Sequence, residues 1–201
     1  MKLFYSPGAC SLSPHIVLRE LGMTFELERV ETKKGKTASG IDYATINPKG
    51  YVPALQLDDG AVLTEGPAIV QYLADRRPES GLAPAAGTIE RYRLQEWLNY
   101  VTSELHKSLG SLFNAAMPAE WKDVTKQALS RKFAFVSNQL AGKEFLLGQR
   151  FTVADSYLFV VSSWTKHLGI DLTLWPDILA YQKRIRGRPA VQAALKAEGL
   201  V

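Results

Sequence analysis

The feature that most constrains the fold is a change of hydrophobic pattern on the two sides of a short linker. Residues 77–87 are rich in Pro, Gly, Ser and Ala and show no periodicity, which is typical of a linker. Before it, short strand patterns alternate with helical ones; after it, no strand pattern competes with helix. The chain has 201 residues, enough for two small domains. We therefore predict an α/β domain over residues 1–80 and an all-helical domain over residues 88–201.

The first domain has the order of a mixed sheet. A strand is predicted at 2–5, a helix at 11–21 and a second strand at 25–30. After a turn at 47–50, the pattern predicts two strands, at 54–57 and 61–63, joined by a tight turn, and then a helix at 65–76. A βαβ unit followed by ββα combines a parallel pair with an antiparallel hairpin.

In the second domain, apolar residues recur at spacings of three, four and seven and predict a long helix over residues 88–113. A second helix is predicted at 121–140. Thr152 and Asp155 have the spacing of a capping box, with Asp in place of the usual Glu or Gln, and so predict a helix start. Pro176 and Pro189 stand where the last two helices would begin.

Composition and charge exclude several classes of protein. The net charge of +4 is spread along the chain and is too weak to indicate nucleic-acid binding. No apolar run is long enough to span a membrane, and the N-terminus lacks the apolar stretch of a signal peptide, so we expect a cytoplasmic protein with no membrane partner. The one cysteine, Cys10, cannot form an intrachain disulfide.

Cys10 stands between the first strand and the first helix. Unpaired N–H groups and the helix dipole at that position favour a thiolate. The alternative, a small buried apolar residue, is equally compatible with the spacing. Cys10 to Ser13 also has the frame of a redox Cys-x-x-Cys motif with Ser in the second place, so disulfide exchange would need a thiol from a small molecule.

Two further segments offer main-chain polar groups or a charge that could bind a ligand. Val52–Pro53 follows a Pro-Lys-Gly turn; a cis bond there would let the Val52 backbone pair with an extended ligand, whereas an ordinary trans turn is the alternative. Glu65 and Gly66 open a helix and suit the ammonium and carboxylate of an amino-acid head group. Glu65 could also merely complement the helix dipole.

On the long helix, Asn99, Ser103 and His106 share one face, which could line a cleft or simply be solvated. The other histidines, His15 and His167, are remote in sequence and no second cysteine accompanies them, so we expect no metal site.

Taken in order, these segments resemble the glutathione S-transferase family, most closely its bacterial beta class. The resemblance covers the whole chain and rests on five segments in register: 6–11 (SPGACS), 47–55 (NPKGYVPAL), 63–69 (LTEGPAI), 104–107 (ELHK) and 151–155 (FTVAD). It implies a thioredoxin-like N-terminal domain, an all-helical C-terminal domain, a homodimer, and glutathione bound along a cis-proline edge.

The resemblance also implies roles for individual residues. Cys10 would sit at the glutathione sulfur, Val52 would pair with the cysteinyl backbone, and Glu65 and Gly66 would take the γ-glutamyl end. Residues of the long helix would close the site, some from the neighbouring subunit. The full glutathione set is Cys10, Tyr51, Val52, Pro53, Glu65, Gly66, Asn99, Ser103, Glu104 and His106.

The sequence departs from the family pattern at two positions. Relatives often carry a lysine for the glycyl carboxylate where this chain has Gly35. Lys33, Lys34 or Lys36 would either substitute for it or form a solvated basic loop. Position 66 is serine in many relatives, so Gly66 keeps the N–H but lacks the hydroxyl.

The resemblance implies thiolate activation and conjugation of glutathione to hydrophobic electrophiles in detoxification, with Cys10, Ser11 and His106 as catalytic residues. The electrophile pocket is expected near Phe113, Trp164 and His167. Three alternatives remain: a glutathione-dependent thiol–disulfide reductase, a dehalogenase using the same site, and a non-enzymatic carrier of glutathione adducts or apolar compounds.

Overall fold

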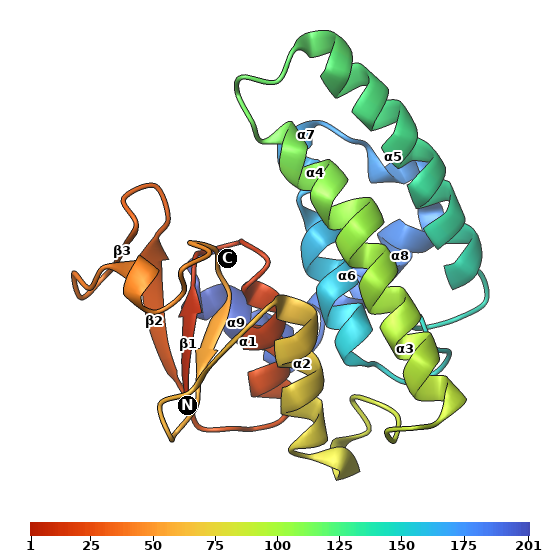
Figure 1. Ribbon diagram of the computed structural model, residues 1–201. Helices are drawn as coiled ribbons and strands as arrows, with labels where there is room; N and C mark the ends of the chain where they lie inside the picture. The colour runs from red at the N-terminus through yellow and green to blue at the C-terminus, as the bar shows by residue number, and fades with distance from the viewer. The chain divides into compact units, whose positions relative to one another are not determined.

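The computed structural model describes residues 1–201, and its internal contacts divide the chain into two compact units. The first contains Met1–Ala83 and Gly187–Val201, and the second contains Pro84–Arg186. The first break lies inside the predicted linker. The end of the chain differs from the prediction, which placed residues 88–201 in one domain. Residues 187–201 belong to the first unit because the last helix, α9 (Pro189–Ala197), packs on α1 (Leu12–Glu20) (Figure 1).

The first unit is built on a five-stranded sheet in the order β3-β2-β1-β4-β5. β1 pairs in parallel with β2 and antiparallel with β4, and β4 forms the antiparallel hairpin with β5. The predicted mixed sheet is therefore confirmed; β3 and a short 3-10 helix, η1, lie in the stretch left unassigned. The elements are β1 (Lys2–Tyr5), β2 (Glu26–Glu31), β3 (Lys36–Thr37), η1 (Tyr43–Thr45), β4 (Ala54–Gln56) and β5 (Val62–Thr64).

Helix α1 forms the centre of the first unit. It packs against both α9 and α2 (Gly66–Asp75), and its residues from Leu12 to Leu18 are all buried. A helix that is buried on most sides has neighbours on most sides. Pro67 lies in the first turn of α2, as expected for a residue that lacks an N–H donor. Because α1 is fixed by these neighbours, it also holds in place the loop that precedes it, residues 6–11.

The second unit is all helical. The predicted long helix is confirmed, but its middle is π-helical, with hydrogen bonds from i to i+5 rather than i to i+4. Its parts are α3 (Ile89–Tyr100), the π-helical η3 (Val101–His106) and α4 (Lys107–Leu112). The other helices are α5 (Ala119–Leu140), α6 (Val153–Ser163), α7 (Thr165–Leu168) and α8 (Pro176–Arg186). Short 3-10 turns occur at η2 (Pro78–Ser80) in the first unit and η4 (Leu172–Leu174) in the second.

The predicted capping box at the start of α6 is confirmed. The Asp155 carboxylate accepts hydrogen bonds from the Leu146 N–H (2.8 Å), the Thr152 N–H (2.8 Å) and the Thr152 hydroxyl (2.9 Å). Tyr181 on α8 also donates to it, at 3.2 Å. Burial raises the pKa of Asp155 to about 6, although these hydrogen bonds act in the opposite direction. Asp155 therefore fixes the position of α6, which carries one residue of the candidate site.

No helix combines the length and the apolar character that crossing a membrane requires.

Candidate functional site

Cys10 and the Val52–Pro53 segment, which are far apart in sequence, meet in the first unit. Cys10 lies in the loop between β1 and α1, directly before the helix cap Ser11, and is half-buried. Its Sγ donates to the Val52 carbonyl oxygen at 3.3 Å. The Val52–Pro53 peptide bond is cis, as the resemblance implied. The only thiol of the chain therefore lies beside main-chain groups of an exposed turn.

The turn before Val52 is held by two buried side chains. The Tyr51 carbonyl oxygen accepts from the Tyr43 hydroxyl at 3.0 Å and from the Asn47 amide at 2.7 Å, while the Tyr51 side chain itself is 75% exposed. Burial raises the pKa of Tyr43 to about 12, so its hydroxyl keeps its proton and remains a donor at neutral pH. Together, the two side chains fix the main chain that leads to the cis bond.

The start of α2 adds Glu65 and Gly66 to the same region. A Cβ on Gly66 would lie 3.8 Å from Pro53 Cγ, so this helix start is next to the cis proline, and a serine would fit there. Glu65 is the one non-glycine residue of the chain with a positive φ, 70°. Such a conformation costs about 1–3 kcal/mol and is commonly retained at functional sites.

The Glu65 carboxylate has a basic partner that the sequence did not indicate. Lys49 Nζ lies 2.6 Å from Glu65 Oε1 and also donates to the Thr64 hydroxyl at 3.1 Å. Both Lys49 and Glu65 are more than half exposed, so the pair is open to water and to ligands. This corner of the sheet thus presents a positive and a negative charge next to a helix N-terminus.

Ser11 is fully buried, and its hydroxyl is used within the loop. The Oγ accepts from the Ser6 N–H at 3.1 Å and donates to the Ser6 carbonyl at 3.2 Å. A hydroxyl has one proton to donate, and here the Ser6 carbonyl receives it. The predicted role of Ser11 at a thiol stays a prediction; the observed contacts give it a place in holding the loop.

The lysines proposed for the glycyl carboxylate lie around β3. Lys34 pairs with Glu31 at 2.6 Å in an exposed ion pair, and that contact lowers the pKa of Glu31. Lys36 begins β3, and Lys33 precedes Lys34 in the exposed turn. Their role with a ligand stays a prediction.

In the second unit, His106 lies at the end of η3 in an aromatic cluster. Its Nδ1 is 2.5 Å from the Tyr157 hydroxyl, and its ring centroid is 5.0 Å from that of Trp164. Phe113 packs edge-on against Trp164, with 6.0 Å between the ring centroids. Two of the three residues predicted for the electrophile pocket, Phe113 and Trp164, are therefore in contact, and Trp164 also packs on His106. The third, His167, is exposed on α7.

Tyr157, on α6, is not among the candidate residues that the sequence indicates. A buried tyrosine hydroxyl usually finds a hydrogen-bond partner, and that requirement was the available signal. The partner, His106, is 51 residues away in the chain, so the sequence alone could not name it.

The remaining predicted residues of the long helix differ in exposure and contacts. Asn99 and Ser103 are exposed, and Ser103 donates to Glu104 Oε1 at 3.3 Å. Glu104 pairs with Lys132 at 3.0 Å, and that contact lowers the pKa of Glu104. Lys132 also donates to the Glu104 carbonyl and the Ser108 hydroxyl, so this residue of α5, absent from the sequence prediction, supports the π-helical segment.

Comparison with known families gives two matches in chain order. Residues 8–76 match the model of the glutathione S-transferase N-terminal domain, and residues 95–189 match that of the C-terminal domain. The glutathione S-transferase GstA of Escherichia coli O157:H7 is 48% identical over 200 residues, covering 100% of both chains.

Solved structures agree with this result over the full length. A ternary complex of BphK, a bacterial glutathione S-transferase, is 58% identical with a TM-score of 0.98, covering 100% of both chains. The bacterial beta-class enzyme of Sphingomonas chungbukensis and a sphingomonad glutathione S-transferase complexed with glutathione are each 49% identical, with TM-scores of 0.97 and 0.96, and each covers 100% of both chains. The thioredoxin-like and all-helical architecture is that of these proteins. The chain belongs to the glutathione S-transferase family and, within it, to the bacterial beta class.

Proposed function

We propose that glutathione binds along the Val52–Pro53 segment with its sulfur beside Cys10, and that its thiolate is conjugated to hydrophobic electrophiles. One observation carries this proposal: the 3.3 Å contact between Cys10 Sγ and the Val52 carbonyl, next to the cis bond. An extended peptide can pair with main-chain groups in such a segment as an added strand. The cysteine of the tripeptide would then be held next to the one thiol of the protein.

The charges at the start of α2 support the placing of the γ-glutamyl end. Glu65 offers a carboxylate to an ammonium group, and the Gly66 N–H lies at a helix N-terminus, where carboxylates are favoured. Lys49 pairs with Glu65 and would have to share it with the ligand. Tyr51 and Pro53 complete this part of the proposed site, and Lys33, Lys34 or Lys36 remains the predicted partner of the glycyl carboxylate.

The chemistry we propose is activation of a thiol. When glutathione is bound, the single Cys10 S–H proton would be donated to the glutathione sulfur instead of the Val52 carbonyl. This hydrogen bond and the field of the α1 N-terminus lower the free energy of the glutathione thiolate relative to the thiol. The thiolate sulfur then forms a bond to the electrophilic carbon, whose leaving group departs with the electron pair of the broken bond. His106 and Ser11 are the other proposed thiol partners, and Phe113 and Trp164 the proposed contacts of the electrophile.

A second activity, thiol–disulfide exchange, is favoured by Cys10, which is half-buried and forms no disulfide in the protein. In this reaction the Cys10 thiolate attacks a glutathione mixed disulfide, forms a protein–glutathione disulfide and releases the second thiol as thiolate. A glutathione thiolate then attacks the protein disulfide, releases Cys10 and leaves as oxidised glutathione. The electrons balance without any further reductant.

Several properties of the proposal rest on the family. We propose a homodimer in which Asn99, Ser103, Glu104 and His106 contribute to glutathione binding, some of them from the neighbouring subunit. A role in detoxification and a cytoplasmic location stay predictions, as do the absence of a metal and of nucleic-acid and membrane partners.

The test of the proposed function is Cys10→Ala, assayed with an aryl halide and with a glutathione mixed disulfide. Exchange should be lost outright because the chain has no other cysteine. Conjugation should fall but remain measurable, because the attacking sulfur belongs to glutathione. Equal retention of both activities would show that Cys10 is a packing residue and would contradict the proposal.

A further inference from the structure

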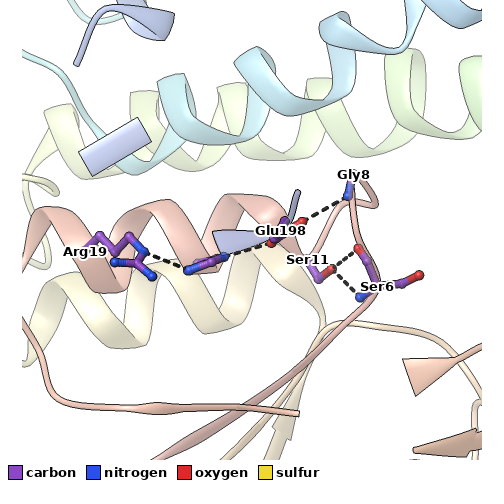
Figure 2. Close-up of polar contacts among 6 residues, drawn as sticks. Ser6, Gly8, Ser11, Arg19 and Glu198 are labelled. Carbon is purple, nitrogen blue, oxygen red and sulfur yellow. Dashed lines mark hydrogen bonds and ion pairs between the residues drawn. The ribbon is translucent and has the colours of Figure 1, made fainter. Parts of the chain in front are cut away.

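A carboxylate from the end of the chain reaches the loop that carries Cys10. Glu198, in the turn after α9, accepts from the Gly8 N–H at 2.9 Å through one carboxylate oxygen. Its other oxygen lies 2.8 Å from Nδ1 of His15 on α1. The side chains of His15 and Glu198 are both fully buried. Figure 2 shows Glu198 between α1 and Gly8.

The direction of each hydrogen bond in this network can be assigned. Arg19 Nε donates to His15 Nε2 at 2.9 Å, and a guanidinium keeps its protons at every relevant pH. His15 Nε2 is therefore the acceptor, so the imidazole proton is on Nδ1 and is donated to Glu198. The chain of donors runs from Arg19 through His15 to Glu198 and leaves the second carboxylate oxygen for the Gly8 N–H.

The main chain of the loop held by Glu198 is also fixed by Ser11. Ser11 binds both main-chain polar groups of Ser6, at the beginning of the loop, but Ser11 lies within the same local segment. Gly8 has a φ of +70°, in the region that favours glycine, and its N–H points to Glu198. Cys10 follows two residues later. The Glu198 carboxylate therefore ties the main chain of this loop to the C-terminal segment, while the Cys10 side chain contacts the Val52 carbonyl.

We propose that Glu198 is a positioning residue for the reactive thiol: by holding the Gly8 N–H, it sets where Cys10 Sγ lies relative to the Val52 carbonyl. The consequence for activity rests on the proposed role of Cys10 at the glutathione sulfur. The positional effect on Cys10 does not depend on glutathione and can be measured without it.

The experiment uses the fact that the chain has one cysteine, so the alkylation rate by iodoacetamide reports Cys10 alone. Glu198→Gln replaces one carboxylate oxygen by an NH₂ group, which cannot accept a hydrogen bond, so either Gly8 or His15 loses its acceptor. We expect the alkylation rate constant at neutral pH to change by about threefold or more, and kcat/KM for the mixed disulfide to fall by about tenfold. Glu198→Asp keeps the charge with a shorter reach and should give an intermediate result.

The matched control is Glu20→Gln. Glu20, at the end of α1, makes a two-pronged ion pair with Arg188 at the start of α9, with distances of 2.7 and 2.9 Å. Both variants thus weaken a carboxylate tie between α1 and the C-terminal segment, but only Glu198 contacts the Cys10 loop. We expect Glu20→Gln to keep the alkylation rate within about twofold of the wild-type protein while lowering the urea midpoint.

The outcomes separate positioning from general support. Equal changes of the Cys10 rate in Glu20→Gln and Glu198→Gln, or a folded Glu198→Gln with wild-type Cys10 kinetics, would overturn the proposal. If Glu198→Gln does not fold, the same comparison is made with Glu198→Asp, and wild-type kinetics there would also overturn it. A changed alkylation rate together with unchanged enzyme kinetics would preserve the positional role and instead contradict the proposed function of Cys10.

Discussion

Cys10 in the first unit and His106 in the second are held by different kinds of contact. The thiol lies in a loop whose main chain is fixed by hydrogen bonds, to Ser11 at one point and to Glu198 at another. The imidazole lies among aromatic rings and makes one short side-chain hydrogen bond, to Tyr157. Main-chain anchoring fixes a position through the backbone itself, whereas aromatic packing fixes it through the volumes of the neighbours.

The difference can be measured because each unit has its own reporter. All four tryptophans lie in the second unit, at positions 97, 121, 164 and 175, whereas the one cysteine lies in the first. Tryptophan fluorescence therefore follows the helical unit, and thiol alkylation follows the loop of the sheet unit. A variant of one unit should move the reporter of that unit first.

The largest effect is expected for Asp155→Ala. The substitution leaves the Leu146 and Thr152 N–H groups without their buried acceptor, so the free energy of unfolding should fall by about 3 kcal/mol. Urea denaturation followed by tryptophan fluorescence measures it. The control is Asp171→Ala, because Asp171 also accepts hydrogen bonds from the N–H and the hydroxyl of a threonine, Thr173, but at an exposed site. This substitution should lower the free energy of unfolding by about 1 kcal/mol or less. Equal decreases in the free energy of unfolding in the two variants would contradict the claim that the larger effect at Asp155 comes from its burial.

The titration of Asp155 gives a pH dependence with a definite sign. Its pKa is raised from 3.8 to about 6 in the folded protein, so the folded state binds the proton more tightly than the unfolded chain. The contribution of this group to stability is therefore present at pH values below about 4 and is lost as pH rises through about 6. Relative to Asp155→Asn, the wild-type protein should gain on the order of 2 kcal/mol between pH 7 and pH 4. Parallel stability curves for the two proteins would show that Asp155 does not titrate in this range.

A smaller effect is expected in the first unit for Glu65→Gln. Loss of the carboxylate charge should raise the KM for glutathione about tenfold, because a charged hydrogen bond is worth about 1.5–3 kcal/mol, while kcat changes less. Steady-state kinetics with an aryl halide measure both. The control is Glu28→Gln, which changes another carboxylate of the first unit. Glu28 accepts a hydrogen bond from the Ser39 N–H at 3.0 Å, and this variant should keep the wild-type KM for glutathione. An unchanged KM for glutathione in Glu65→Gln would contradict the proposal that Glu65 binds the γ-glutamyl end.

The smallest effect is expected for Tyr157→Phe. The ring remains and the hydroxyl contact to His106 Nδ1 is lost, so the imidazole keeps its packing but not its fixed hydrogen bond. We expect kcat for conjugation to fall about threefold, with the Cys10 alkylation rate unchanged. Tyr100→Phe, which removes a hydroxyl contact to the Lys132 carbonyl at 3.4 Å, is the matched control and should have wild-type kcat. A wild-type kcat in Tyr157→Phe would mean that aromatic packing alone orients His106.

The same contrast explains what could be predicted from the sequence. The succession of most strands and helices along the chain, the long helix and the Thr152–Asp155 cap follow from periodicity and from residues within a few positions of each other. The π-helical segment has no comparable local pattern, because it is a single wider turn inside a helix whose apolar spacing continues through it. The sequence also did not predict that α9 belongs to the first unit. Its sequence shows that the helix is amphipathic but not which unit its apolar face covers.

In the candidate site, the local sequence identified Cys10, Val52–Pro53 and Glu65 as candidate functional residues. Their alternative, purely structural interpretations could not be weighed without interatomic distances. The structure adds the Cys10–Val52 contact and the positive φ of Glu65, and both are three-dimensional facts. Glu198 illustrates the limit: it lies 190 residues from Gly8, and nothing near it in the sequence distinguishes it from a surface carboxylate.

The central claim, that glutathione places its sulfur at Cys10, is tested most directly by a crystal structure of the wild-type protein with glutathione. We expect the tripeptide sulfur within hydrogen-bonding distance of Cys10 Sγ, the cysteinyl main chain paired with Val52, and the γ-glutamyl ammonium on Glu65 with Lys49 displaced or shared. A tripeptide bound with its sulfur turned away from Cys10, or bound outside the Val52–Pro53 segment, would contradict the account.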